Sequence, residues 1–420
     1  MALAPRVRPL LTTLAAVAAV VAAGWLGAAQ AGALPVVRIS TAGPIVDDPK
    51  VDGRMTIPRA GGGGGRLSSR IGIEVRGQAS QRFPKKQFSL ETRDATGDGR
   101  DVSLLGLPED DDWILYAAYN DGSLLRNVVA YRAARELGRY ASRHRFVEVV
   151  LNGRYWGVYV LQESLELGQD RVPGPGDGSD GFLLEYTHPS KIDPGDTLFR
   201  TPVTRTPIVY ADPERGDMSR ARAREIAGRV GAFERDLYRR GYRHPTQGYK
   251  RHLDLAAAVD YVLLYELFRN YDAFAASTYI HEGPNATLAM GPLWDFDLSM
   301  GNPASLLPPR GCSLCDRRWV GRWYDDPAFV RAMVERWTAL RRQGVVSEIL
   351  GGIARDARAL TGPQVRNLRR WPVLGFTPVS AGASDAALRS AYRGEIARLR
   401  GWIRTRSGWL TANLARIGRL

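Results

Sequence analysis

The chain has 420 residues, 44 % of them apolar, which is enough for a sizeable core in two lobes or domains and excludes an intrinsically disordered protein. Its formal net charge of +14 results from 58 lysines and arginines against 44 acids. Such a charge can attract nucleic acid or an anionic cell-surface polymer. However, the arginines are spread over the C-terminal half without a compact basic run, so we favour a solvated basic surface. We expect no specific nucleic-acid partner, and an anionic surface polymer stays open as an alternative.

Residues 1–31 predict an N-terminal secretory signal. Arg6 and Arg8 form a short basic start, Leu10 to Ala23 form an apolar run, and Ala29 to Ala31 form a small-residue site. We therefore expect an exported protein that is extracellular or associated with the cell surface. The alternative is a retained anchor, because the apolar character continues beyond Ala23 towards membrane-spanning length.

The region 34–190 is predicted to form short strands and one helix. The helix is expected over Ser123 to Leu137, with Asp121 or Ser123 as its N-cap. The dipeptide Asn152-Gly153 suits a tight type I′ turn and gives the strongest hairpin signal in the chain. The expected strands are Leu34–Ser40, Ile71–Gly77, Lys86–Glu91, Trp113–Tyr116, Arg145–Leu151, Tyr155–Leu161 and Phe182–Tyr186.

A polar turn from Gly77 to Arg82 joins the two strands of the first hairpin. It opens with glycine and is suited to offering backbone N–H groups to a phosphate. Lys85 and Lys86 then begin the return strand, where consecutive side chains point to opposite faces. Only one of them can therefore face a nucleotide. The alternative is two solvated lysines.

The region 191–420 is predicted to be largely helical. Cys312 and Cys315 are the chain's only cysteines, and in an exported protein they predict a local disulfide. A zinc site would need two further ligands. The expected helices are Asp217–Arg239, Leu253–Phe268, Pro327–Gln343, Val345–Leu360 and Ser384–Leu420.

Three acids within the segment 263–302 lie among apolar and aromatic residues. Carboxylates in such surroundings are normally paired or bound to a cation, so Asp272, Asp295 and Asp297 suggest a metal site. A short hairpin, predicted between Ser277 and Leu293, would return Asp295 to the side of Asp272. Protein kinases place their catalytic and magnesium-binding aspartates in this order. The structural alternative is that the acids pair with an arginine such as Arg269, or with backbone N–H groups.

Five ordered motifs resemble those of the CotH kinase family, the spore coat protein H-like proteins. They are Arg76–Ser80 with Phe83–Lys86, Ser123–Asn127, Asn152–Tyr159, Asn270–Asp272 and Trp294–Asp297. The resemblance covers about Ile71 to Asn302, and the C-terminal third contributes little to it. It implies an α+β, atypical protein-kinase-like fold of two lobes. A mainly antiparallel small-lobe sheet with one helix would occupy 34–190, and a mainly helical lobe with the catalytic segment 263–302 and a C-terminal helical extension would occupy 191–420.

The resemblance also implies transfer of the ATP γ-phosphate to serine or threonine hydroxyls of secreted, coat or surface proteins. Asp272 would be the catalytic aspartate. Asp295 would bind Mg²⁺ or Mn²⁺, with Asp297 as a further ligand. Where the family commonly has an asparagine ligand, this chain offers Ser277 as a weaker substitute.

The nucleotide phosphates would be covered by the turn containing Arg76, Gly77, Gln78 and Ser80. Lys86, or less favourably Lys85, would neutralise the α- and β-phosphates. The carboxylate that pairs with this lysine is Glu136 or Glu163, and the sequence does not decide between them.

Two other functions remain as alternatives to the kinase. A non-catalytic exported protein could use the same fold to bind the cell wall or another surface partner, which would explain Ser277 and the charge of +14. A metal-dependent hydrolase built on the three aspartates is the least favoured, because the five histidines show no ligand spacing.

Overall fold

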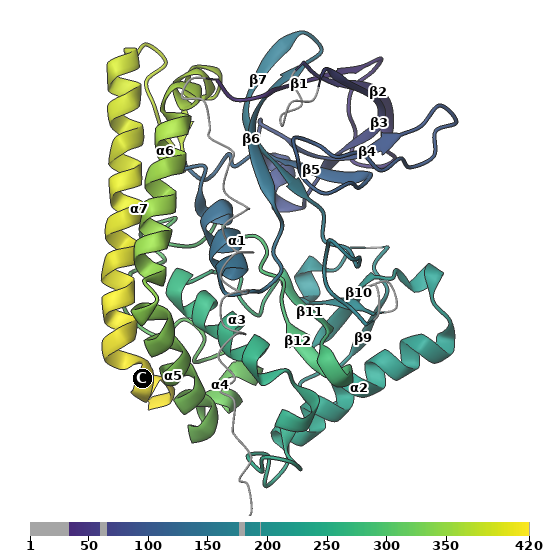
Figure 1. Ribbon diagram of the computed structural model, residues 1–420, viewed down its shortest axis with the longest axis vertical. Helices are drawn as coiled ribbons and strands as arrows, with labels where there is room; N and C mark the ends of the chain where they lie inside the picture. Colours follow the sequence, from purple (N-terminus) through teal and green to yellow (C-terminus); the bar gives the residue numbers. More distant parts are fainter. Residues whose placement is uncertain (1–32, 59–64, 176–180, 194, 420) are drawn as a thin grey trace, which may run out of the picture. The chain divides into compact units, whose positions relative to one another are not determined.

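The computed structural model describes residues 33–58, 65–175, 181–193 and 195–419 (Figure 1). All the elements described belong to one compact unit, Leu34–Leu420. The predicted signal at 1–31 lies outside the described residues. In this part of the chain, no helix combines the length and apolar character needed to cross a bilayer.

The first part of the chain contains the expected mainly antiparallel sheet, and its seven strands close into a barrel (Figure 1). Their order is β1-β2-β3-β4-β5-β7-β6, and every pair is antiparallel except β1 with β6, which closes the barrel. Closure leaves no unpaired strand edge. The strands are β1 Val36–Thr41, β2 Val51–Ile57, β3 Leu67–Arg76, β4 Gln87–Arg93, β5 Asp112–Tyr116, β6 His144–Leu151 and β7 Arg154–Glu163. Of these, β2 was not predicted.

Alternation along each strand separates the barrel interior from its outer face. In β5, Trp113 and Leu115 pack inside the barrel, whereas Ile114 and Tyr116 join the core outside it. The predicted β6–β7 hairpin is confirmed, and its turn residues Asn152 and Gly153 have φ values of 49° and 76°.

Helix α1 (Arg126–Glu136) begins three residues later than predicted. The predicted N-cap at Asp121 or Ser123 is wrong, because Leu125 occupies the N-cap position. The Asp121 carboxylate nevertheless accepts hydrogen bonds from Ser123 N at 2.9 Å and from Arg126 N, the first residue of the helix, at 2.8 Å. The helix therefore starts from a fixed acidic turn.

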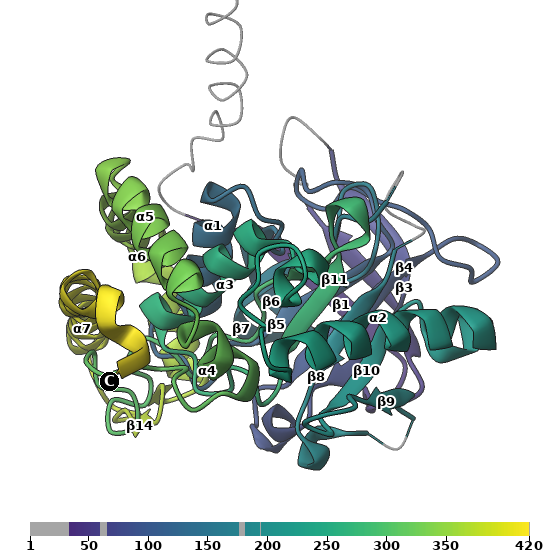
Figure 2. The same ribbon diagram turned by 90° about the horizontal axis from the view of Figure 1, so that it is seen from below.

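A second sheet has the order β12-β11-β8-β10-β9. The predicted acid-flanked hairpin is confirmed as β11 paired with β12. Helix α2 (Arg220–Tyr238) lies beside β10 in Figures 1 and 2, and Tyr210 Oη donates to Ala223 O at 2.8 Å. The strands are β8 Leu183–Tyr186, β9 Leu198–Arg200, β10 Pro207–Asp212, β11 Thr278–Glu282 and β12 Leu288–Met290, with β9 and β10 unpredicted.

The C-terminal part is mainly helical, as predicted. Helices α6 (Val345–Arg370) and α7 (Asp385–Asn413) lie side by side in both views (Figures 1 and 2). Helix α6 continues ten residues past its predicted end, and α7 stops before its predicted end. The other helices are α3 Leu255–Phe268, α4 Arg318–Tyr324 and α5 Pro327–Arg342, of which α4 was not predicted; β13 Val373–Leu374 and β14 Thr377–Pro378 form a small hairpin between α6 and α7.

The predicted disulfide between Cys312 and Cys315 is confirmed, so these thiols are not zinc ligands. Its loop docks on the end of α3, where the Glu266 carboxylate accepts a hydrogen bond from Leu314 N at 3.0 Å. The same carboxylate meets the guanidinium of Arg406 from α7 at 2.7 Å, and both side chains are fully buried. This ion pair joins three distant segments.

Arg406→Met should lower the free energy of unfolding by about 3–5 kcal/mol, because it leaves the Glu266 carboxylate buried without its cation. Urea denaturation followed by tryptophan fluorescence measures the change. Arg369→Met is the control, since the Arg369–Asp385 pair is about half exposed and should contribute much less to stability. Equal small effects of the two substitutions would contradict the prediction.

Candidate functional site

A cavity of about 550 Å³ lies between the outer face of the barrel and the segment that carries the three acids. It collects residues from widely separated parts of the chain. Nine of the predicted site residues line it: Arg76, Gly77, Gln78, Ser80, Lys85, Asp272, Ser277, Asp295 and Asp297. Three predicted residues, Lys86, Glu136 and Glu163, do not line it.

Asp295 and Asp297 form the acidic centre of the cavity. The segment after β12 turns sharply at Asp295, whose φ is 56°. Burial raises the pKa of Asp295 well above its usual range, and the neighbouring Asp297 and Asp272 carboxylates raise it further. Burial also raises the pKa of Asp297, against a hydrogen bond from Asn120 that lowers it. Without a cation, the pair therefore retains protons more readily than free aspartates.

Asp272 lies on the same cavity wall, three residues after Arg269 ends α3 in a left-handed conformation (φ 49°). Asp272 N donates to Asn270 Oδ1 at 2.9 Å, which fixes the turn. Burial raises the pKa of Asp272, while Lys191 and Arg317 lower it. The alternative in which Arg269 pairs with the acids is wrong, because its guanidinium donates to Pro308 O at 2.6 Å.

Across the described ranges, no group of three or more histidine, cysteine or acidic residues is arranged to hold a metal ion. The oxygen atoms of Asp295 and Asp297 nevertheless suit a hard cation such as Mg²⁺, which takes one or two carboxylates and completes its shell with water and phosphate. Ser277 lines the cavity, and its backbone N donates to Glu185 Oε1 at 2.8 Å. Its predicted role as a ligand stays a prediction.

Asn120 is a cavity residue that the sequence did not reveal. Its side-chain amide donates to Asp297 Oδ2, and its backbone carbonyl accepts from Asn302 Nδ2 at 3.0 Å. In the sequence, Asn120 stands directly before Asp121, in the turn that leads into the predicted helix. Nothing in that pattern distinguishes a cavity residue from an ordinary turn residue.

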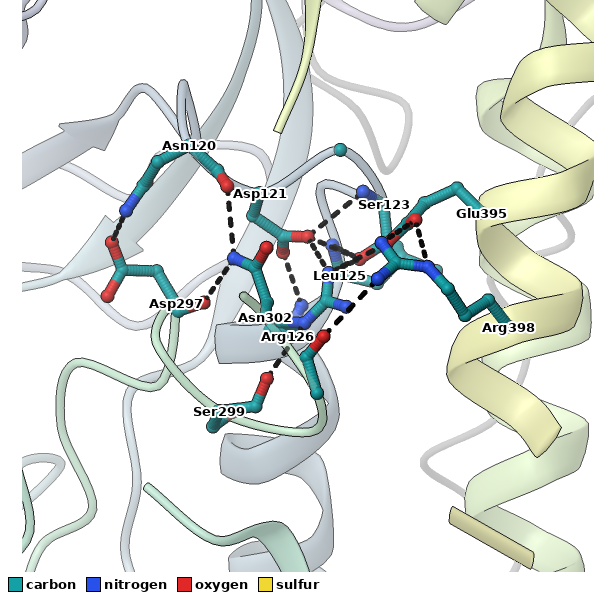
Figure 3. A network of polar contacts seen from close by, with 12 residues as sticks. Asn120, Asp121, Ser123, Leu125, Arg126, Asp297, Ser299, Asn302, Glu395 and Arg398 are labelled. Carbon is teal, nitrogen blue, oxygen red and sulfur yellow. Dashed lines mark hydrogen bonds and ion pairs between the residues drawn. The ribbon is translucent and has the colours of Figure 1, made fainter. Parts of the chain in front are cut away.

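Arg126 connects this acidic loop to the C-terminal helices (Figure 3). Its buried guanidinium donates to Ser299 O at 3.0 Å and to Glu395 Oε1 of α7 at 3.0 Å, and it also pairs with Asp121. The position of Asp297 therefore depends on α1 and α7 as well as on its own loop.

The structure corrects the choice of lysine. Lys85 lines the cavity with only 2 % of its surface exposed, whereas Lys86 lies outside the lining and donates to Gln81 O. Both lysines precede β4, which begins at Gln87 and not at Lys86 as predicted, so strand alternation does not determine which of them faces the cavity. Burial lowers the pKa of Lys85 well below its usual range.

The expected carboxylate partner of the lysine is also wrong. Glu163 is buried in ion pairs with Arg143 at 2.6 Å and Arg171 at 3.0 Å. Glu136 lies near the end of α1, outside the cavity lining.

Neutral acceptors surround Lys85 instead of a carboxylate. Its Nζ donates to Ala117 O at 2.7 Å, Val158 O at 2.5 Å and Asn367 Oδ1 at 3.1 Å. Gly157 allows this approach, because a Cβ at that position would lie 2.6 Å from Asn367 Oδ1. Asn367 belongs to α6, for which the sequence offered no functional signal. Among the described residues, Lys85 therefore forms no ion pair.

Arg76 brings a second positive charge to the cavity. Its guanidinium lies over the Trp294 ring, 5.7 Å from the centroid. Burial lowers the pKa of Arg76, and the nearby Asp295 partly offsets this effect. Among the described residues it forms no ion pair, so this guanidinium is available to an anion.

The polar turn after β3 closes over the cavity. Gly77 has a φ of 93°, and a Cβ there would lie 2.2 Å from Ser80 Oγ, so glycine is required. Gln78 Nε2 donates to Lys191 O at 2.8 Å and to Asp193 Oδ1 at 2.9 Å, which connects the turn to the second part of the chain.

The fold and the cavity define a mixed α/β protein whose barrel faces an acid-bearing hairpin across a ligand-sized cavity. The family model described as CotH kinase protein matches residues 73–410, so the chain belongs to the CotH kinase family. No curated protein matches the chain. Because the match extends through α5, α6 and most of α7, the C-terminal helices are part of the family pattern, contrary to what the motifs indicated. The family is kinase-like and generally uses ATP with a divalent metal.

The raised pKa values of Asp295 and Asp297 predict how stability depends on pH. Between the ordinary aspartate pKa and the raised values, the folded state holds more protons than the unfolded state, so stability falls as pH rises. Thermal unfolding with a chelator present, from about pH 5 to about pH 8, should show this fall.

Asp295→Asn should flatten the slope and raise the midpoint at the upper end of this range, because it removes one of the two carboxylates. Added Mg²⁺ should stabilise the unsubstituted protein more than the variant. Identical slopes for the two proteins would contradict the assignment of the slope to this pair.

Proposed function

We propose that the protein transfers the γ-phosphate of ATP to serine or threonine hydroxyls of exported, coat or surface proteins. In this proposal the barrel is the small lobe of a kinase-like arrangement, and the segment after it provides the larger, mainly helical lobe. The observation that carries the proposal is the convergence of Asp272, Asp295 and Asp297 with the cations Arg76 and Lys85 in one cavity. Phosphoryl transfer needs these charges in fixed positions and no covalent nucleophile.

Lys85 and Arg76 bind the phosphate oxygens. In the free protein Lys85 Nζ donates three hydrogen bonds, and among the described residues Asn367 is the only side chain that accepts one of them. The contact with Asn367 is therefore the one that a phosphate oxygen replaces. Asp295 and Asp297 hold a divalent ion, which when bound neutralises phosphate charge. The turn that contains Gly77 excludes water from the phosphates.

Asp272 orients the acceptor hydroxyl and takes its proton as the hydroxyl oxygen bonds to the γ-phosphorus. The bond between that phosphorus and the β–γ bridging oxygen breaks, and ADP leaves with the bond's electron pair. The raised pKa of the Asp272 carboxyl group makes its carboxylate a better proton acceptor than that of an ordinary aspartate. Export follows from the predicted signal at 1–31 and is part of the same proposal.

Asp272→Asn should lower γ-phosphate transfer at least about 100-fold, because the amide cannot accept the hydroxyl proton. ATP binding with Mg²⁺ or Mn²⁺, measured by calorimetry, should persist in this variant. Asp295→Asn should instead abolish metal-dependent binding. Radiolabelled ATP and serine- and threonine-containing protein substrates measure the transfer.

A folded protein that binds ATP with neither metal would overturn the kinase proposal. The remaining function would be a surface-binding module on the same fold.

Lys85→Gln should weaken ATP binding by about tenfold or more, since it removes one of the two basic groups that bind the phosphate oxygens in this proposal. Lys86→Gln is the matched control, because its side chain lies outside the cavity lining, and it should leave the affinity unchanged. Calorimetry compares the two, with circular dichroism to verify folding. The opposite result would assign the phosphate contact to Lys86.

A further inference from the structure

The outer face of β5 and β7 forms one wall of the cavity. Tyr116 and Gln162 both belong to this wall, on neighbouring strands in which Ile114 pairs with Gln162 and Tyr116 pairs with Val160. Neither residue was among the predicted site residues. Their positions follow from alternation, since the intervening Leu115 and Leu161 pack inside the barrel.

Both side chains carry a polar atom that lacks a partner. Among the residues that the structure describes, Tyr116 Oη and Gln162 Oε1 are buried and form no hydrogen bond. Tyr116 is 8 % exposed and Gln162 is 2 % exposed. Buried polar groups are nearly always hydrogen-bonded, so two unsatisfied atoms on one cavity wall point to a ligand that satisfies them.

The surroundings indicate which part of a ligand each atom meets. Burial raises the pKa of the Tyr116 hydroxyl well above the usual range, and the carboxylates of Asp297, Asp121 and Asp295 raise it further. The hydroxyl therefore keeps its proton and is a donor beside the acids that would hold a metal–phosphate group.

The carbonyl of Gln162 has the opposite requirement. An amide Oε1 only accepts hydrogen bonds, and the phosphates of ATP at neutral pH offer no donor. The donors of ATP are the amino group of its base and the hydroxyls of its ribose. The unsatisfied Gln162 Oε1 therefore matches the nucleoside part of the ligand.

We propose that Tyr116 and Gln162 bind the nucleotide directly, with Tyr116 Oη donating to a phosphate oxygen and Gln162 Oε1 accepting from an N–H or O–H group of the nucleoside. This inference rests on the proposed function and deepens it. It also explains why the free protein retains two groups whose burial costs stability.

The test uses the near-isosteric substitutions Tyr116→Phe and Gln162→Met, which remove the unsatisfied atoms and keep the packing. Each variant should unfold at the same temperature as the unsubstituted protein or at a higher one, because no protein hydrogen bond is lost. Each should bind ATP with Mg²⁺ about tenfold more weakly by calorimetry.

Inorganic triphosphate distinguishes the two contacts, because it lacks the nucleoside. Tyr116→Phe should weaken triphosphate binding as much as ATP binding, whereas Gln162→Met should weaken only ATP binding. Ser142→Ala is the matched control. It removes another buried hydroxyl without a partner in the described part of the chain, and this hydroxyl lies outside the cavity lining, so ATP affinity should not change.

Unchanged ATP affinity in both variants overturns the inference while leaving the proposed function intact. A lower unfolding temperature in either variant also overturns it for that residue, because the atom then has a partner in the free protein. Failure of the unsubstituted protein to bind ATP with either metal overturns the proposed function, and this inference with it.

Discussion

The cavity depends on charges that are held in place by neutral groups. Asparagine amides fix the acidic loop: Asn127 accepts from Phe296 N at 2.6 Å, Asn270 donates to Asp295 O at 2.8 Å, and Asn302 donates to Asp297 O at 2.7 Å. Lys85 is likewise held by two backbone carbonyls and an asparagine. Neutral partners fix the positions of these side chains without cancelling their charges. The aspartates of the acidic loop can therefore still attract a cation, and Lys85 can still attract an anion.

The same arrangement explains why the C-terminal helices belong to the site. Glu395 of α7 contacts Arg126, Asn367 of α6 contacts Lys85, and Arg406 of α7 pairs with Glu266 at the end of α3. The first contact holds α1, which carries the cavity residue Asn127, and the second holds the cavity residue Lys85 itself. The third holds the end of α3, just before the segment that contains Asp272. Helices α6 and α7 therefore hold the segments that form the cavity in position. This role accounts for a family match that continues to residue 410.

The features that the sequence predicted correctly are governed by local interactions. The Asn152-Gly153 turn, the hairpin after Asp272, the buried helix α3 and the disulfide all depend on neighbouring residues. Helix α3 could be recognised because it is apolar on all sides.

The errors arose where distant segments decide the outcome. Lys85 and Lys86 are adjacent lysines, and their sequence does not show which one is buried. The acceptors of Lys85 come from distant segments: the backbone carbonyls of Ala117 and Val158, and Asn367 from α6. Barrel closure depends on the pairing of β1 with β6, about 110 residues apart. Asn120 is likewise part of the site only because the loop of Asp297 reaches it.

Alternation in the barrel strands has a further consequence for how this protein can change. In β5 and β7, the inward residues Trp113, Leu115, Tyr159 and Leu161 belong to the barrel core, while Tyr116 and Gln162 on the outer face line the cavity. Alternate positions of the same strands therefore serve different purposes: one set packs the barrel core, and the other set contacts the ligand. Substitutions in one set can accumulate with little effect on the other, so a single scaffold can acquire new specificities without rebuilding its core.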